Sequence, residues 1–163
     1  MIAVLAKLAA LAHFLLLFAV ADHVVTVEAP QLHDDRAAAA IAYVAAFDEP
    51  LPGSGDPMFT EIEMLAGSFQ ESSWNADAVG KAGEIGLFQI WKGGPEMRDP
   101  VANARAGLAQ MRVSFRDCPS SPWAEFLGGP HGIHNARVRR MSARREALAA
   151  RFLMILSGAP DGA

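Results

Sequence analysis

Two Asp-Pro pairs, each followed by an apolar stripe of helical spacing, constrain the fold most strongly. Asp56-Pro57 and Asp99-Pro100 are typical helix starts, because proline is tolerated in the first turn and an aspartate before it can cap the free backbone N–H groups. Apolar residues then recur every three or four positions, namely Phe59, Ile62, Leu65, Ala66 and Phe69 after the first pair, and Val101, Ala104, Leu108, Met111 and Phe115 after the second. This spacing predicts two helices, each with one buried face.

Three further segments are predicted to be helical. They are the alanine-rich residues 35–47, a short segment at 123–127 and a long one at about 135–156. In the long segment, arginines at 137, 139, 140, 144, 145 and 151 predict a charged, partly exposed face, opposite a buried face of Val138, Met141, Leu148, Phe152 and Ile155.

Proline- and glycine-rich stretches separate the predicted helices. Residues 49–57 and 91–97 are expected to be loops, 128–132 a turn, and the glycine-punctuated run 80–86 a compact loop or short irregular hairpin. A chain of 163 residues is long enough for one sizeable core. We therefore expect a single, mainly α domain with little or no sheet.

The first 21 residues have the layout of a secretory signal peptide. Lys7 precedes an apolar run, and the run ends in the small-x-small motif AVA at 19–21, before Asp22. An uncleaved membrane anchor is the alternative, because counting from Ile2 reaches the ~20 residues that a spanning helix needs. In either case we expect residues 22–163 to be exported, as a periplasmic or secreted domain that meets a membrane only through an uncleaved N-terminus.

Composition excludes several classes of protein. Cys118 is the only cysteine, so no intramolecular disulfide can form. No Cys/His set has the spacing of a zinc site, and no metal is expected. The net charge of −4 argues against a nucleic-acid binder.

Glu71 is the candidate catalytic residue. It lies at the end of the first proline-capped helix, slightly off the apolar stripe, so its carboxyl group can sit at the edge of the core and face a cleft. Partial burial favours the protonated form of a carboxyl group, which a general acid needs. Ser72, Ser73 and Asn75 are expected to end the helix through local hydrogen bonds. The large aromatic residues Trp74 and Phe88 are expected in the core.

The residues around Glu71 resemble the signature of soluble lytic transglycosylases, a family of lysozyme-like fold. The likeness is carried by the runs 71–79 (ESSWNADAV) and 83–90 (GEIGLFQI), which match Glu-Ser, an aromatic residue, Asn or Asp, and then Gly-x-x-Gly-Leu-x-Gln-Ile. The runs 99–107 (DPVANARAG) and 124–130 (AEFLGGP) are similar to two later family blocks. The resemblance covers residues 56–140 and implies a lysozyme-like domain over 22–163.

The resemblance also implies an activity, the cleavage of peptidoglycan glycan strands without a cofactor. Glu71 would protonate the oxygen between N-acetylmuramic acid and N-acetylglucosamine, and then accept the proton of the muramic 6-hydroxyl, closing a 1,6-anhydro ring. Gln89 would line the sugar site and hydrogen-bond an N-acetyl or hydroxyl group, unless it is a solvated loop-end residue. Ser72 would bond Glu71 or substrate, or else cap the backbone.

Two departures from the family pattern leave alternatives open. Phe126 and Leu127 stand where the family has Tyr-Asn, so Phe126 can desolvate Glu71 but cannot orient it by a hydrogen bond. Glu84 replaces a small residue; it is either a solvated loop charge or, if it faces the cleft, a second carboxylate for water attack. The alternatives are therefore a hydrolytic lysozyme using Glu84, and a cell-wall-binding or structural protein with weak turnover.

The expected partners are peptidoglycan strands. By analogy alone, a short enzyme of this kind fits a specialised role, such as opening the wall for a secretion apparatus or in phage assembly.

Overall fold

The computed structural model describes residues 35–53, 56–91 and 93–156. The chain runs through α2 (Asp35–Phe47), α3 (Pro57–Ser72), η1 (Pro95–Arg98), α4 (Pro100–Asp117), α5 (Ala124–Gly128), η2 (Gly129–His134) and α6 (Ala136–Leu156), where η denotes a 3₁₀ helix. Extended pairing within these ranges is limited to two isolated bridges, Val79 with Ile85 and Ile85 with Ile90. The mainly α prediction is confirmed. The predicted signal segment 1–21 lies outside the described residues.

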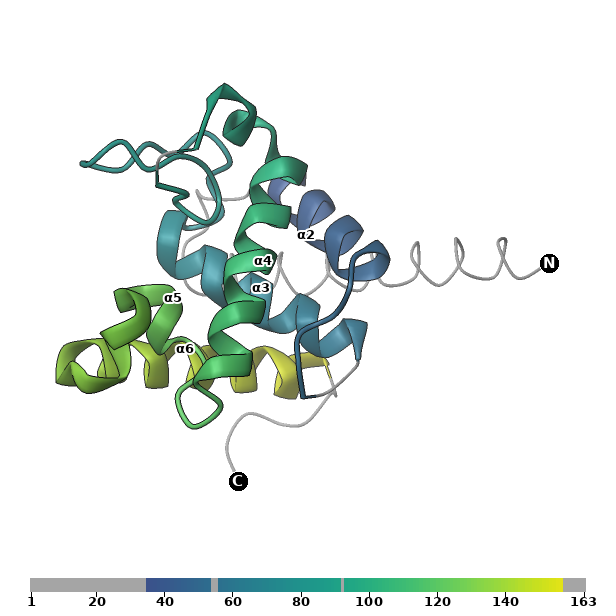
Figure 1. Ribbon diagram of the computed structural model, residues 1–163. Helices are drawn as coiled ribbons and strands as arrows, with labels where there is room; N and C mark the ends of the chain where they lie inside the picture. Colours follow the sequence, from purple (N-terminus) through teal and green to yellow (C-terminus); the bar gives the residue numbers. More distant parts are fainter. Residues whose placement is uncertain (1–34, 54–55, 92, 157–163) are drawn as a thin grey trace.

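Helix α3 is the centre of the domain. It packs against α2 and α6, while α4 passes across it and contacts α2, and α5 lies to one side and contacts both α4 and α6 (Figure 1). Because helices surround it, every residue from Thr60 to Ser68 is buried. The prediction of one buried face for this helix was therefore too narrow. None of the helices in the described part of the chain is long and apolar enough to cross a membrane.

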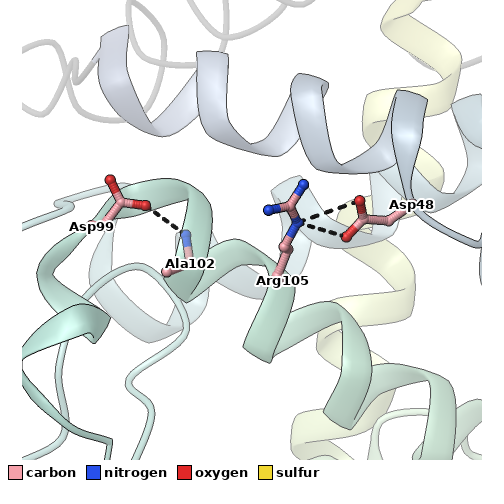
Figure 2. Close-up of polar contacts among 4 residues, drawn as sticks. All are labelled: Asp48, Asp99, Ala102 and Arg105. Carbon is pink, nitrogen blue, oxygen red and sulfur yellow. Dashed lines mark hydrogen bonds and ion pairs between the residues drawn. The ribbon is translucent and has the colours of Figure 1, made fainter.

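The two predicted helix starts are confirmed. Asp56 caps α3 by accepting a hydrogen bond from the Met58 backbone N–H at 2.9 Å. Asp99 caps α4 through the Ala102 backbone N–H at 2.8 Å (Figure 2). One turn further along α4, Arg105 donates from Nε to Asp48 Oδ2 at 3.0 Å, which ties α4 to the end of α2 (Figure 2).

The connecting segments are more regular than the sequence predicts. The loop predicted at 91–97 contains the start of η1, and the turn predicted at 128–132 runs from the last residue of α5 into η2. The short helix predicted at 123–127 is α5, displaced by one residue at each end. The glycine-punctuated run does form a compact loop, held by the two bridges at Ile85.

The arginines of α6 differ in exposure. Arg137, Arg139, Arg140 and Arg144 are exposed and Arg151 is partly exposed, as predicted. Arg145 is buried, with only 2% of its side-chain surface exposed, so the prediction of an exposed residue was wrong at this position. The reason is helical spacing: positions 138, 141, 145, 148 and 152 recur every three or four residues and share one face. Arg145 therefore points inward with the apolar residues.

Candidate active site

A cleft of about 740 Å³ opens beside the C-terminal end of α3. Its walls come from segments far apart in the sequence: Gln70 and Glu71 of α3; Gly80, Lys81, Glu84, Phe88, Gln89 and Trp91 of the loop; Gln110 of α4; Phe126 and Leu127 of α5; and Met141 and Arg145 of α6. Four predicted site residues, Glu71, Glu84, Gln89 and Phe126, are thus brought to one cavity.

Glu71 forms an ion pair with Arg145 in the wall of this cleft. Arg145 Nη2 donates a hydrogen bond to Glu71 Oε1. The Glu71 side chain remains 22% exposed, whereas that of Arg145 is almost entirely covered. The carboxylate therefore sits at the edge of the core, as its position at the helix end predicts. The cation that holds it was not among the predicted site residues.

Two aromatic rings enclose the Arg145 guanidinium. Its Cζ lies 5.2 Å from the centre of the Trp123 ring and 5.6 Å from that of Phe126, which is within cation–π range. The two rings contact each other edge to face, with centroids 5.3 Å apart. Burial lowers the pKa of Arg145, and the nearby Glu71 carboxylate opposes that shift. Phe126 thus helps to shield the guanidinium of the ion pair from solvent.

Trp123 connects the site to a second buried carboxylate. Its Nε1 donates to Glu63 Oε2 at 3.0 Å, and its indole is fully buried. Burial raises the pKa of Glu63 to about 7; the Trp123 hydrogen bond opposes this shift and the charge of Glu146 adds to it. A Cβ at Gly67 would overlap the Trp123 ring, so a glycine is needed for this close approach to α3. Glu63, Trp123, Arg145 and Glu71 form a continuous chain of contacts.

Asn103 of α4 anchors the loop that forms one wall of the cleft. Its side chain is fully buried. Nδ2 donates to the backbone carbonyls of Ile85 at 2.8 Å and Met97 at 3.0 Å, and Oδ1 accepts from the Phe88 N–H at 2.9 Å. One amide therefore satisfies three backbone groups of the segment 85–97 and fixes it against α4.

Gln89 and Glu84 hold the loop closed as well as lining the cleft. Gln89 has a left-handed backbone (φ 47°), and its Nε2 donates to the Gly86 carbonyl at 2.8 Å. Glu84 Oε2 accepts from the Ala82 N–H at 3.0 Å. A Cβ at Gly80 would overlap both side chains. The condition that makes Glu84 a candidate second carboxylate, facing the cleft, is met.

Ser72 is placed differently from the other predicted site residues. Its hydroxyl donates to the Ser68 carbonyl of α3 at 3.1 Å, and Ser72 is not part of the cleft wall. A bond to the backbone is one of the two roles predicted for this residue. Trp74 and Phe88 are buried in the core, as predicted, and Phe88 also reaches the cleft.

Four exposed cleft residues were not predicted. Trp91 is 61% exposed, and Gln70, Lys81 and Gln110 are exposed in the same lining. Trp91 directly follows the family-like run, but no spacing rule marks it as a wall residue. Gln110 lies on the exposed side of α4, and only the folded loop brings it to the cleft.

No three His, Cys, Asp or Glu side chains gather as a metal site within the described ranges. Comparisons of the chain with protein-family models, with curated proteins and with solved structures found no match. The resemblance to lytic transglycosylases therefore rests on the residues themselves.

Proposed function

We propose that the protein is a peptidoglycan lytic transglycosylase with Glu71 as its general acid and base. The observation that carries the proposal is the position of Glu71: a mostly covered carboxylate in the wall of a cleft that is also lined by Glu84, Gln89 and Phe126. The cleft volume of about 740 Å³ is in the range of sites for small ligands or a few sugar units. Amides and aromatic faces, the groups that bind sugars, line it.

In the proposed reaction one carboxyl group acts twice. Protonated Glu71 gives its proton to the glycosidic oxygen as the C1–O bond breaks and an oxocarbenium-like centre develops. The Glu71 carboxylate then takes the proton of the muramic 6-hydroxyl, whose oxygen bonds to C1. Glu71 ends protonated, and the products are an anhydromuramic end and a new N-acetylglucosamine end. No water and no cofactor are consumed.

Two observations favour the alternatives. Glu84 lines the same cleft, which supports a hydrolytic lysozyme in which a second carboxylate activates water. The Arg145–Glu71 ion pair requires the charged form of Glu71, which supports a wall-binding protein with weak turnover, since a general acid must carry a proton.

Mass spectrometry of the products formed from purified peptidoglycan separates the three functions. A lytic transglycosylase releases muropeptides with anhydromuramic ends, one water lighter than hydrolysed products. A lysozyme gives hydrated reducing ends, which should disappear in Glu84→Gln. A binding protein sediments with the wall and releases nothing.

Glu71→Gln is the decisive variant. It should lower turnover at least about 100-fold, the usual contribution of a general acid, while binding to the wall persists. Glu49→Gln is the matched control, because Glu49 is exposed and is not part of the cleft wall. If Glu71→Gln releases muropeptides as fast as the wild-type protein, the role given to Glu71 is wrong.

A further inference from the structure

The ion pair at Glu71 conflicts with the acid step of the proposed reaction. Arg145 Nη2 donates to Glu71 Oε1, and the charge attraction within the pair exists only while the glutamate is a carboxylate. The acid step requires the protonated form. Protonation of Glu71 therefore leaves the buried Arg145 charge without its anion, which is unfavourable unless another anion takes that place.

Arg145 has unused donors for such a partner. In the part of the chain that the structure describes, its buried Nε and Nη1 groups have no hydrogen-bond partner, which is unfavourable for a buried polar group. The rings of Trp123 and Phe126 cover the guanidinium. A guanidinium donates in its plane, in the fork geometry that matches a carboxylate.

The cleft is suited to an anionic group near Glu71. Arg145 forms part of its wall, and a second cation, Lys81, lies on the loop side of the same cavity. Peptidoglycan strands differ from neutral polysaccharides in bearing peptide stems, whose carboxylates are the abundant anions of this polymer. The bond to be cleaved adjoins the sugar that carries the stem.

We infer that the Arg145–Glu71 ion pair, called the latch below, holds Glu71 in its resting state. A carboxylate of a peptide stem breaks this pair when a glycan strand enters the cleft. The stem carboxylate pairs with the guanidinium, and Glu71, which is in contact with solvent, takes a proton from hydronium in that solvent. The inference rests on the proposed function and adds to it a substrate class: strands that carry charged stems. A neutral strand would leave the latch closed.

The test compares two forms of one substrate. Glycan strands with native stems are set against the same strands after their stem carboxylates have been converted to methylamides. The wild-type protein should bind native strands at least tenfold more tightly than methylamidated ones and cleave them at least tenfold faster. In Arg145→Gln both preferences should fall to within about twofold.

Two further variants keep the test interpretable. Arg144→Gln is the matched control, since this neighbour on α6 is exposed and lies outside the cleft wall; it should retain both preferences. Arg145→Lys keeps a charge but loses the fork, so its preference should lie between those of wild type and Arg145→Gln. It also replaces the glutamine variant if that variant does not fold.

Binding and turnover report on separate claims. Equal affinity of the wild-type protein for the two strands overturns the latch, and so does a preference that survives in Arg145→Gln. Neither result bears on cleavage. Absence of products from native strands, with the tenfold binding preference intact, overturns the proposed enzyme but leaves carboxylate binding at Arg145 in place.

Discussion

At the scale of single residues, the cleft wall depends on the Asn103 amide. It satisfies three backbone groups of the loop segment that carries Phe88 and Ile85. Asn103→Ala leaves those groups without their partner in a buried place, and each such loss costs about 1–3 kcal/mol. We expect the variant to lose about 3 kcal/mol of unfolding free energy and to lose turnover with it.

Urea denaturation of Asn103→Ala beside Asn75→Ala measures this effect. Asn75 makes a local bond to the Asp77 N–H at 2.9 Å and is exposed, so its loss should cost at most about 1 kcal/mol. Similar losses in the two variants would show that the buried amide is not what fixes the loop.

Single residues also show what the sequence could and could not predict. Glu71, Glu84, Gln89 and Phe126 were identified by their types and local order, and all four line one cleft. Arg145 was predictable in principle, because it lies on the same helical stripe as apolar residues of α6. Its charge predicted a surface position, because a buried charge is unfavourable unless it is paired. The Glu71 carboxylate on α3 supplies that partner. That pairing joins residues 74 positions apart.

At the scale of elements, α5 is held by a hydroxyl group of another helix. It has five residues, too few for stability without tertiary support. Ser114 of α4 is fully buried, and its Oγ accepts from the backbone N–H groups of Glu125 at 3.1 Å and Phe126 at 3.0 Å. This bond places Phe126 beside Arg145.

Ser114→Ala should therefore weaken both the fold and the site. Loss of an acceptor for two N–H groups is expected to cost about 2 kcal/mol and to lower turnover by displacing Phe126. Thermal unfolding and muropeptide release are the measurements, with Ser72→Ala as the control, because that hydroxyl donates to the Ser68 carbonyl of its own helix. If Ser72→Ala reduces turnover more than Ser114→Ala does, the roles given to the two hydroxyls are reversed.

Helix boundaries were predictable because their signals are local. The Asp-Pro starts and the apolar stripes require no knowledge of the rest of the chain. The burial of α3 on all sides was not predictable from its own stripe, because it results from α2, α4 and α6 packing around one helix. Thr60 is an example of a polar residue that is buried in this way. Its hydroxyl accepts a hydrogen bond from the buried Leu51 N–H at 2.9 Å, and this contact forms because the loop before α3 packs against the helix.

At the scale of the whole molecule, the buried carboxylate of Glu63 makes stability depend on pH. Burial raises its pKa from 4.5 to about 7, so the folded protein holds this proton where the unfolded chain releases it. Between those values the native state binds more protons, and by linkage the unfolding free energy falls as pH rises. The contribution is complete below pH 4.5 and is lost as pH rises through 7.

Glu63→Gln isolates this contribution. An amide oxygen can still accept the Trp123 N–H, but the side chain no longer titrates. Between pH 5 and 7.5 the wild-type protein should lose roughly 2 kcal/mol of unfolding free energy relative to the variant, from 1.36 kcal/mol for each unit of pKa difference. Urea denaturation at the two pH values gives this difference, with Glu49→Gln as an exposed control. If the difference in unfolding free energy between the wild-type protein and Glu63→Gln is the same at both pH values, Glu63 is ionised in the folded protein. The Trp123 indole, which contacts the Arg145 guanidinium, would then donate to a charged carboxylate.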